Sequence, residues 1–120
     1  SERLRLEMYK QIAEIRSADD VDAVRSELAD RYGEPPLPVE QLLAVAVLRN
    51  RARELGVVDI VAQGRNVRIE PVSLPESRKV RLQRLYPGAV YKQATSQLLV
   101  PKPDGDAVAW AMSLLNTVIG

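Results

Sequence analysis

The stretch that decides the fold is residues 27–56, ELADRYGEPPLPVEQLLAVAVLRNRARELG. Its first part has the composition of a charged helix, and Gly33 is typical of the residue that follows a helix because it tolerates the left-handed conformation. Pro35, Pro36 and Pro38 then remove amide donors and restrict the residues before them, which predicts a stiff link. A second, leucine-rich helix follows, so the sequence predicts two helices whose relative angle is set by a proline-rich connection.

Upstream of this stretch, apolar residues recur at the spacing of one helix face. The first predicted helix spans residues 2–16 and has the stripe Leu4, Met8, Ile12 and Ile15. The second begins after Ser17, because a serine three residues before Asp20 is the pattern of a capped helix N-terminus. Its predicted buried stripe is Val21, Val24, Leu28 and Tyr32. The leucine-rich third helix is expected over residues 39–55.

Downstream, the apolar period changes from that of helices to that of strands. Two hairpins are predicted, from residues 57–62 with 67–72 and from residues 90–94 with 97–101. Between them we expect a short helix that starts at Ser73 or Ser77 and reaches Leu85. A last helix starts at Asp104 or Asp106 and has the stripe Val108, Met112, Leu115 and Ile119. The order ααα-ββ-α-ββ-α predicts an α+β fold whose helical N-terminal half packs with a small, mostly antiparallel sheet.

Composition restricts the class of protein. A chain of 120 residues with 46% apolar residues predicts a single domain over residues 1–120. It contains neither cysteine nor histidine, so disulfides, thiolates and imidazole proton transfer are excluded, and we do not expect an enzyme. No apolar run approaches the roughly 20 residues of a membrane-spanning helix, and no signal-like segment opens the chain, so we expect a soluble, cytoplasmic protein. The start inside a predicted helix and the abrupt end at Gly120 predict a fragment of a longer polypeptide.

The net charge of +1 conceals an uneven distribution of charges. Residues 2–34 carry nine acidic and six basic side chains, a balance of −3. Residues 65–92 carry seven basic and two acidic side chains, a balance of +5. We therefore expect one acidic and one basic face, and fields of this kind steer association and fix orientation.

Two acidic groups on the second helix are candidate sites. Glu27 and Asp30 lie three residues apart and off the apolar stripe, which predicts an exposed pair that either only solubilises the helix or docks arginines of a partner. Asp19, Asp20 and Asp22 could hold a divalent cation, but they lack the later glycine and glutamate of a calcium loop. A helix start that suits the helix dipole is the favoured interpretation of these three.

A basic run formed by Arg78, Lys79, Arg81 and Arg84 is the other candidate site. On a helix, residues 78, 81 and 84 would form one stripe, which suffices for weak, salt-sensitive contact with nucleic acid. The alternative is a solvated helix face in a domain whose total charge is near zero.

Two segments resemble a known family. Residues 2–15, ERLRLEMYKQIAEI, and residues 26–57, SELADRYGEPPLPVEQLLAVAVLRNRARELGV, are similar to the C-terminal domain of bacterial transcription-repair coupling factors. The D-R-[YF]-G-x-x-P motif at residues 30–36, followed by a leucine-rich helix ending in Leu-Gly, is the specific part. The resemblance is strong over residues 2–60 and rests on the order of elements beyond them.

The resemblance implies a non-catalytic domain without a cofactor, since ATP and Mg²⁺ belong to the motor domains of the parent DNA translocase. It implies an autoinhibitory domain that packs against an N-terminal UvrB-like module, masks the surface that UvrA binds and restrains the motor. UvrA, RNA polymerase and DNA would be reached only through the parent, and no membrane is involved. In the family, acidic positions of the second helix face arginines of that module, and they match Glu27 and Asp30.

The second half of the chain departs from the enterobacterial form, with a shorter hairpin and Pro71 in the predicted second strand. No partner contacts are therefore carried onto residues 65–120. The alternative to an autoinhibitory domain is a nucleic-acid-binding module that uses the basic segment from Arg78 to Lys92.

Overall fold

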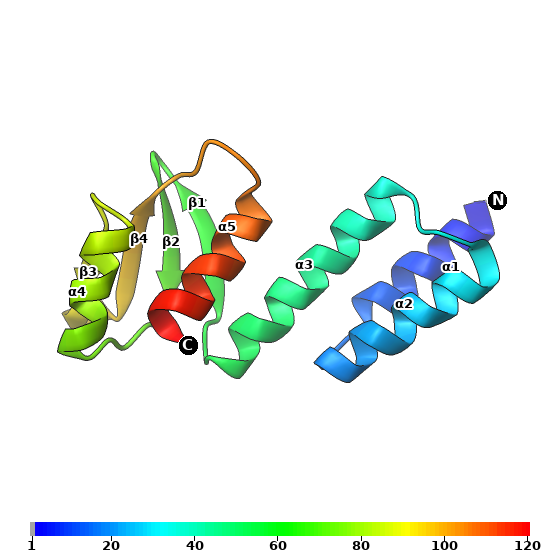
Figure 1. Ribbon diagram of the computed structural model, residues 1–120, viewed down its shortest axis with the longest axis horizontal. Coiled ribbons are helices and arrows are strands. Elements are labelled where there is room, and N and C mark those ends of the chain that lie inside the picture. The colour runs from blue at the N-terminus through cyan, green and yellow to red at the C-terminus, as the bar shows by residue number, and fades with distance from the viewer. Residues whose placement is uncertain (1) are drawn as a thin grey trace. The chain divides into compact units, whose positions relative to one another are not determined.

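The computed structural model describes residues 2–120 and divides into two compact units (Figure 1). The N-terminal unit ends at Asn50, and the C-terminal unit comprises residues 51–120. Along the chain, the elements follow the order of three helices, two strands, a helix, two strands and a helix. The predicted α+β class and element order are therefore confirmed, whereas the single domain over residues 1–120 stays a prediction.

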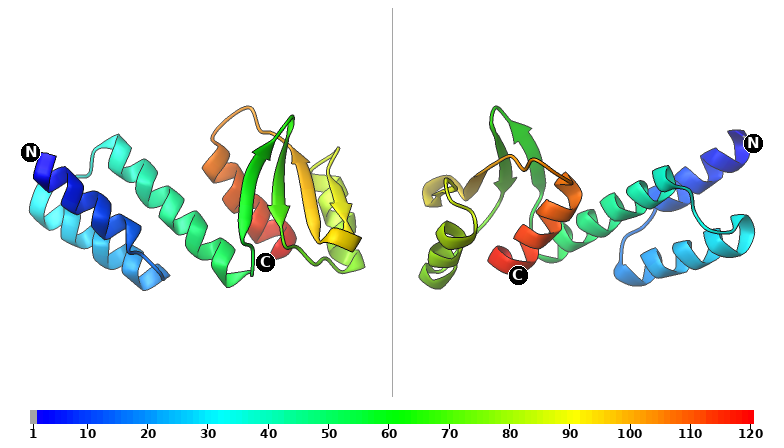
Figure 2. Two further views of the ribbon diagram at one scale, coloured as in Figure 1. Left: turned by 180° about the vertical axis from the view of Figure 1, so that it is seen from behind. Right: turned by 45° about the horizontal axis from the view of Figure 1, so that its top comes forward.

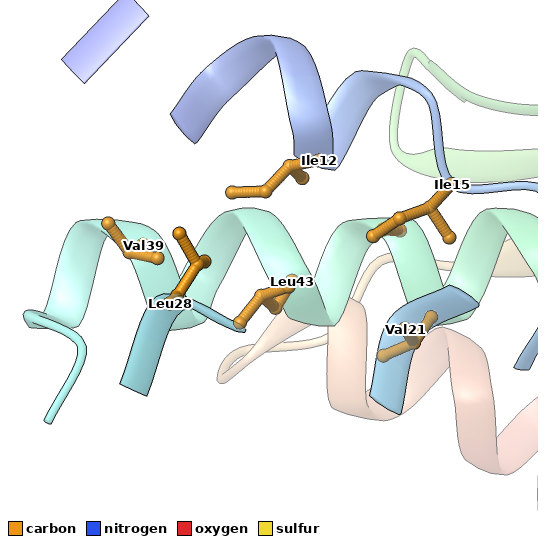
Figure 3. Close-up of a cluster of buried hydrophobic side chains, with 7 residues drawn as sticks. Ile12, Ile15, Val21, Leu28, Val39 and Leu43 are labelled. Carbon is orange, nitrogen blue, oxygen red and sulfur yellow. The ribbon is translucent and has the colours of Figure 1, made fainter. Parts of the chain in front are cut away.

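The N-terminal unit is built from α1 (Glu2–Ala13), α2 (Ala18–Tyr32) and most of α3 (Leu37–Glu54). Its core contains side chains from all three helices and from the link after α1, as Figure 3 shows. The core residues are Ile12, Ile15, Val21, Leu28, Val39, Leu43 and Ala46. Both predicted stripes thus point inward, except that Leu4 is 42% exposed. No helix in residues 2–120 combines the length and the apolarity that crossing a membrane requires.

Both ends of α2 are closed by the residues that the sequence predicted. The Ser17 hydroxyl accepts a hydrogen bond from the amide of Asp20 at 3.1 Å, and the Asp20 carboxylate accepts one from the amide of Arg16 at 3.0 Å. At the other end, Gly33 has φ of 77° and its amide donates to the carbonyl of Ala29 at 2.9 Å. Groups that a helix end leaves without partners are therefore satisfied at both termini.

The C-terminal unit contains a four-stranded antiparallel sheet in the order β1-β2-β4-β3. Its strands are β1 (Asp59–Gln63), β2 (Asn66–Glu70), β3 (Val90–Lys92) and β4 (Gln97–Pro101). Gly64, with φ of 60°, begins the two-residue turn between β1 and β2. The two predicted hairpins are joined into one sheet by pairing of β2 with β4, where Ile69 lies opposite Leu98.

Two helices cover one face of this sheet (Figures 1 and 2). They are α4 (Glu76–Leu85) and α5 (Ala107–Leu114), and α5 continues into a π-helical turn over Leu115–Ile119. The side chains with the least exposure in this unit come from the sheet and from both helices: Ile69, Leu82, Leu98, Leu114, Leu115 and Val118. The unit therefore has a conventional core between a helical layer and a sheet.

Several predicted boundaries were wrong for local reasons. Helix α3 begins two residues before the predicted start, because Pro38 is tolerated in a first helical turn. Strand β2 ends at Glu70 instead of continuing through Pro71, which has no amide to donate to a ladder. Helix α4 is preceded by Pro75 rather than capped by Ser73 or Ser77, and no side chain closes its N-terminus.

The last helix differs from its prediction in which face it buries. Asp106 caps it as expected, accepting from the amides of Val108 and Ala109 at 3.0 and 3.1 Å. The buried residues are Ala111, Leu114, Leu115 and Val118. Of the predicted stripe only Leu115 is buried, whereas Val108, Met112 and Ile119 are half-buried. Apolar residues surround most of this helix, so their spacing could not select the arc that faces the sheet.

Replacing Ser17 with alanine should lower the free energy of unfolding by about 1 kcal/mol, the usual cost of losing a side-chain N-cap. Ser26→Ala is the matched control, because Ser26 lies exposed inside α2. Urea denaturation followed by circular dichroism measures both variants. Equal stability of the two would show that the cap of α2 contributes nothing.

Candidate functional site

The acidic residues of α2 lie beside a shallow groove between α1 and α2. The groove has a volume of about 220 Å³ and is lined by Gln11, Glu14, Ile15, Asp20, Ala23, Val24 and Glu27. Asp30 is exposed one helical turn beyond Glu27. We call Glu14, Asp20, Glu27 and Asp30 together the acidic surface. It brings both predicted residues, Glu27 and Asp30, to one side of the N-terminal unit.

The packing of α2 explains why these carboxylates face outward. Leu28 and Val21 are 1% and 6% exposed, so they fix the arc of α2 that enters the core. Glu27 and Asp30 lie outside that arc, and the Glu27 side chain is 43% exposed. Both groups can therefore be reached by a partner without disturbing the core.

One carboxylate of the acidic surface already has a partner within its own helix. Glu27 Oε1 lies 3.4 Å from Arg31 Nη2, in an i,i+4 pair whose side chains are 43% and 56% exposed, respectively. Such surface pairs contribute only about 0.3–0.5 kcal/mol, so a guanidinium from a partner can replace Arg31. Asp30 forms no ion pair with any residue that the structure describes. Glu27 and Asp30 are thus both available for ion pairs with a partner protein.

Glu14 belongs to the acidic surface although sequence reasoning did not select it. It follows the last residue of α1, and residues 15–17 form only a short link before α2. A link this short makes the two helices antiparallel neighbours, so Glu14 returns to the side of Asp20. That short link was the signal that could have identified it.

Of the three aspartates at the start of α2, Asp20 has a structural role in closing the N-terminus of the helix. Asp20 accepts the hydrogen bond from the Arg16 amide, and Asp19 and Asp20 lie in the first turn, where negative charge suits the helix dipole. Within residues 2–120, no group of three or more aspartates or glutamates is arranged to hold a metal ion.

The basic run formed by Arg78, Lys79, Arg81 and Arg84 is not a fully solvated stripe. Arg78 and Arg81 are half-buried, and each donates from Nη1 to the carbonyl oxygen of Thr117, at 3.1 and 3.0 Å. This carbonyl belongs to the last turn of the C-terminal helix, where carbonyls lack helical partners and positive charge is favourable. Two of the four predicted phosphate ligands therefore fasten α4 to the end of the chain.

The other two cations of the run differ from each other. Lys79 Nζ lies 2.9 Å from the Glu76 carboxylate and 3.1 Å from the Gln93 side-chain oxygen, and it sits 5.7 Å from the centre of the Tyr91 ring. Arg84 is exposed and has no ion pair among the residues that the structure describes. The sequence could show only the i,i+3 pair of Lys79 with Glu76, since Tyr91, Gln93 and Thr117 lie far away along the chain.

Because Arg78 and Arg81 bind the Thr117 carbonyl, we expect them to contribute more to stability than Arg84 does. The double variant Arg78→Met, Arg81→Met should lower the free energy of unfolding by about 1–3 kcal/mol, because the carbonyl loses both charged donors. Arg84→Met is the control and should stay within about 0.5 kcal/mol of the parent. Thermal and urea melts compare the three proteins. Equal loss in both variants would contradict a special role for Thr117.

The fold defines a class already represented among solved structures. The chain is similar to the "Crystal structure of C-terminal domain of transcription-repair coupling factor", with a TM-score of 0.69 and 17% sequence identity. The alignment covers 98% of this chain and 83% of the solved chain. At this identity, the likeness establishes the fold.

The family follows from the sequence. A profile of the TRCF domain matches residues 1–82, and this chain belongs to the TRCF domain family. It is 47% identical over 104 residues, 86% of its length, to the transcription-repair-coupling factor of Mycobacterium tuberculosis. The protein of the same name from Escherichia coli is 40% identical over 53 residues, 44% of this chain. The chain spans only 8% of the mycobacterial relative and 5% of the other.

These matches confirm the resemblance drawn from residues 2–15 and 26–57. They also extend it, since the family profile continues to residue 82 and the mycobacterial alignment covers 104 residues. The matched family is the TRCF domain and not a motor domain.

Proposed function

We propose that this chain is a non-catalytic, autoinhibitory interaction domain of a transcription-repair coupling factor, acting in the cytoplasm as part of a longer protein. Membership of the TRCF domain family supports the assignment to a transcription-repair coupling factor. The acidic surface supports autoinhibition by contact with a basic partner. The observation that carries the proposal is that Asp30 is exposed and Glu27 half-exposed on a helix whose Val21 and Leu28 are buried.

The partner of the acidic surface is an arginine-bearing face of the N-terminal UvrB-like module. Covering that face hides the surface that UvrA binds and restrains the ATP-driven translocase. Guanidinium groups suit this contact, because they bind carboxylates through paired hydrogen bonds. RNA polymerase and DNA are reached through the rest of the protein.

The strength of the contact suits a lock that has to open. Exposed ion pairs contribute about 0.2–1 kcal/mol each, so a few of them give an interface that dissociates readily. Within one polypeptide, tethering supplies a high effective concentration and keeps even a weak contact mostly closed. The apparent affinity for UvrA is then reduced by the fraction of molecules that remain closed.

A nucleic-acid-binding module has less support. Arg78, Lys79 and Arg81 are all engaged with partners inside the C-terminal unit. Among the residues that the structure describes, this leaves Arg84 and Lys92 as the exposed cations of the basic segment without an ion pair. Two exposed cations release few counterions and give little affinity for phosphate backbones.

Reversing the two charges tests the lock. In a full-length transcription-repair coupling factor that carries this domain, Glu27→Lys with Asp30→Lys should increase UvrA affinity by about two- to thirtyfold. The range corresponds to the loss of two exposed ion pairs that hold the closed state. Isothermal titration with purified UvrA measures the affinity.

The control is Asp59→Lys with Asp104→Lys, which makes the same change in net charge at exposed positions of the C-terminal unit. It should leave UvrA affinity unchanged, and thermal melts should show that both double variants are folded. An unchanged affinity in the α2 variant would refute the lock, and an equal increase in both would reduce it to a net-charge effect.

A further inference from the structure

A second surface of the N-terminal unit is apolar, and the acidic residues do not contribute to it. A groove of about 530 Å³ runs between α1 and α3. Its lining is formed by Tyr9, Ile12, Ala13, Pro38, Gln41, Leu42, Val45, Ala46 and Arg49. Two alanines among these residues leave space between the helices, because a larger side chain at either would fill it. The volume lies in the range of pockets that bind ligands.

This groove continues into a neighbouring one. The second has a volume of about 440 Å³ and is lined by Leu4, Arg5, Met8, Tyr9, Tyr32, Pro36, Pro38 and Val39. Tyr9 and Pro38 belong to both linings, so the two form one continuous depression, the α1–α3 groove. Successive turns of α1 meet successive turns of α3 along it. At 1.5 Å per residue, its length is roughly 15–20 Å, about three turns of helix.

The walls of the α1–α3 groove expose apolar side chains that the core does not use. Leu4, Tyr9, Leu42 and Val45 are each between 37% and 42% exposed, and Leu37 beside them is 70% exposed. Exposed apolar residues that gather on one face of a domain mark an interaction site more often than scattered ones do.

The charges of the α1–α3 groove all have one sign. Arg5 lies near one end and Arg49 near the other, and no carboxylate belongs to either lining. Neither arginine forms an ion pair with any residue that the structure describes. An apolar groove with a free cation at each end complements an apolar ligand with carboxylates at its two ends.

We propose that the α1–α3 groove binds one acidic amphipathic helix of a partner protein. The partner helix lies between α1 and α3 as a fourth helix of the N-terminal unit, with its apolar stripe against Tyr9, Leu42 and Val45. Its carboxylates pair with Arg5 and Arg49. Helices commonly bind in this way, with anchors at i, i+3, i+4 and i+7 of the bound segment.

This inference does not depend on the proposed function. The acidic surface lies between α1 and α2 and would attract arginines, whereas the α1–α3 groove attracts carboxylates. Loss of one contact therefore leaves the other testable, and the two experiments use different partners and different variants.

The test uses two synthetic 16-residue helical peptides that share a leucine stripe and differ only in flanking charges, glutamate in one and lysine in the other. Each is titrated into the ¹⁵N-labelled 120-residue chain and followed by NMR. The glutamate peptide should shift amide signals around Tyr9, Leu42 and Val45 in a saturable way. In the variant Arg5→Glu, Arg49→Glu, its affinity should fall roughly 2- to 30-fold and that of the lysine peptide should rise.

The matched control is Arg65→Glu with Arg84→Glu, which makes the same charge change at exposed positions of the C-terminal unit. It should keep the preference for the glutamate peptide. Equal affinity for both peptides, shifts confined to other surfaces, or no binding at about 1 mM peptide would overturn the proposal. Dimers in sedimentation that Leu42→Ser abolishes would also overturn it, because a second copy would then occupy the groove.

Discussion

The burial of Leu28 is the constraint on which the N-terminal unit depends. Its side chain is 1% exposed and belongs to the cluster that joins α1, α2 and α3. Because a helix is rigid about its axis, fixing Leu28 in the core also fixes Glu27 and Asp30 outside it. Ser17 and Gly33 close the two ends of α2. The acidic surface is therefore a consequence of core packing, and a change that rotated α2 would remove it.

The N-terminal unit presents two surfaces with different physical properties, and α1 contributes to both. Towards α2 it adds Gln11 to a polar groove that Glu14, Asp20 and Glu27 make negative, and towards α3 it adds Tyr9 to an apolar groove with two cations. Charged rims favour contacts that form fast and release easily, whereas apolar grooves supply most of the affinity of a complex. A domain with both kinds of surface can exchange one partner without losing the other.

Local signals in the sequence predicted more of the fold than of the site. The cap at Ser17, the stop at Gly33 and the change of period after Gly56 each depend on neighbouring residues, and they predicted the element order. Contacts between distant segments could not be predicted in this way. Arg78 and Arg81 meet the carbonyl of Thr117 more than thirty residues later. Likewise, the apolar spacing of the last helix could not select its buried arc, since apolar residues lie on most sides of it.

We have proposed that the acidic surface covers an arginine-bearing face of the N-terminal module of the same protein. The most direct measurement is an NMR titration of the ¹⁵N-labelled 120-residue chain with that module at submillimolar to millimolar concentration, at two salt concentrations. If the acidic surface makes this contact, the shifts will centre on Glu27 and Asp30 and will weaken at higher salt. Shifts that avoid α2, or that do not depend on salt, would contradict it.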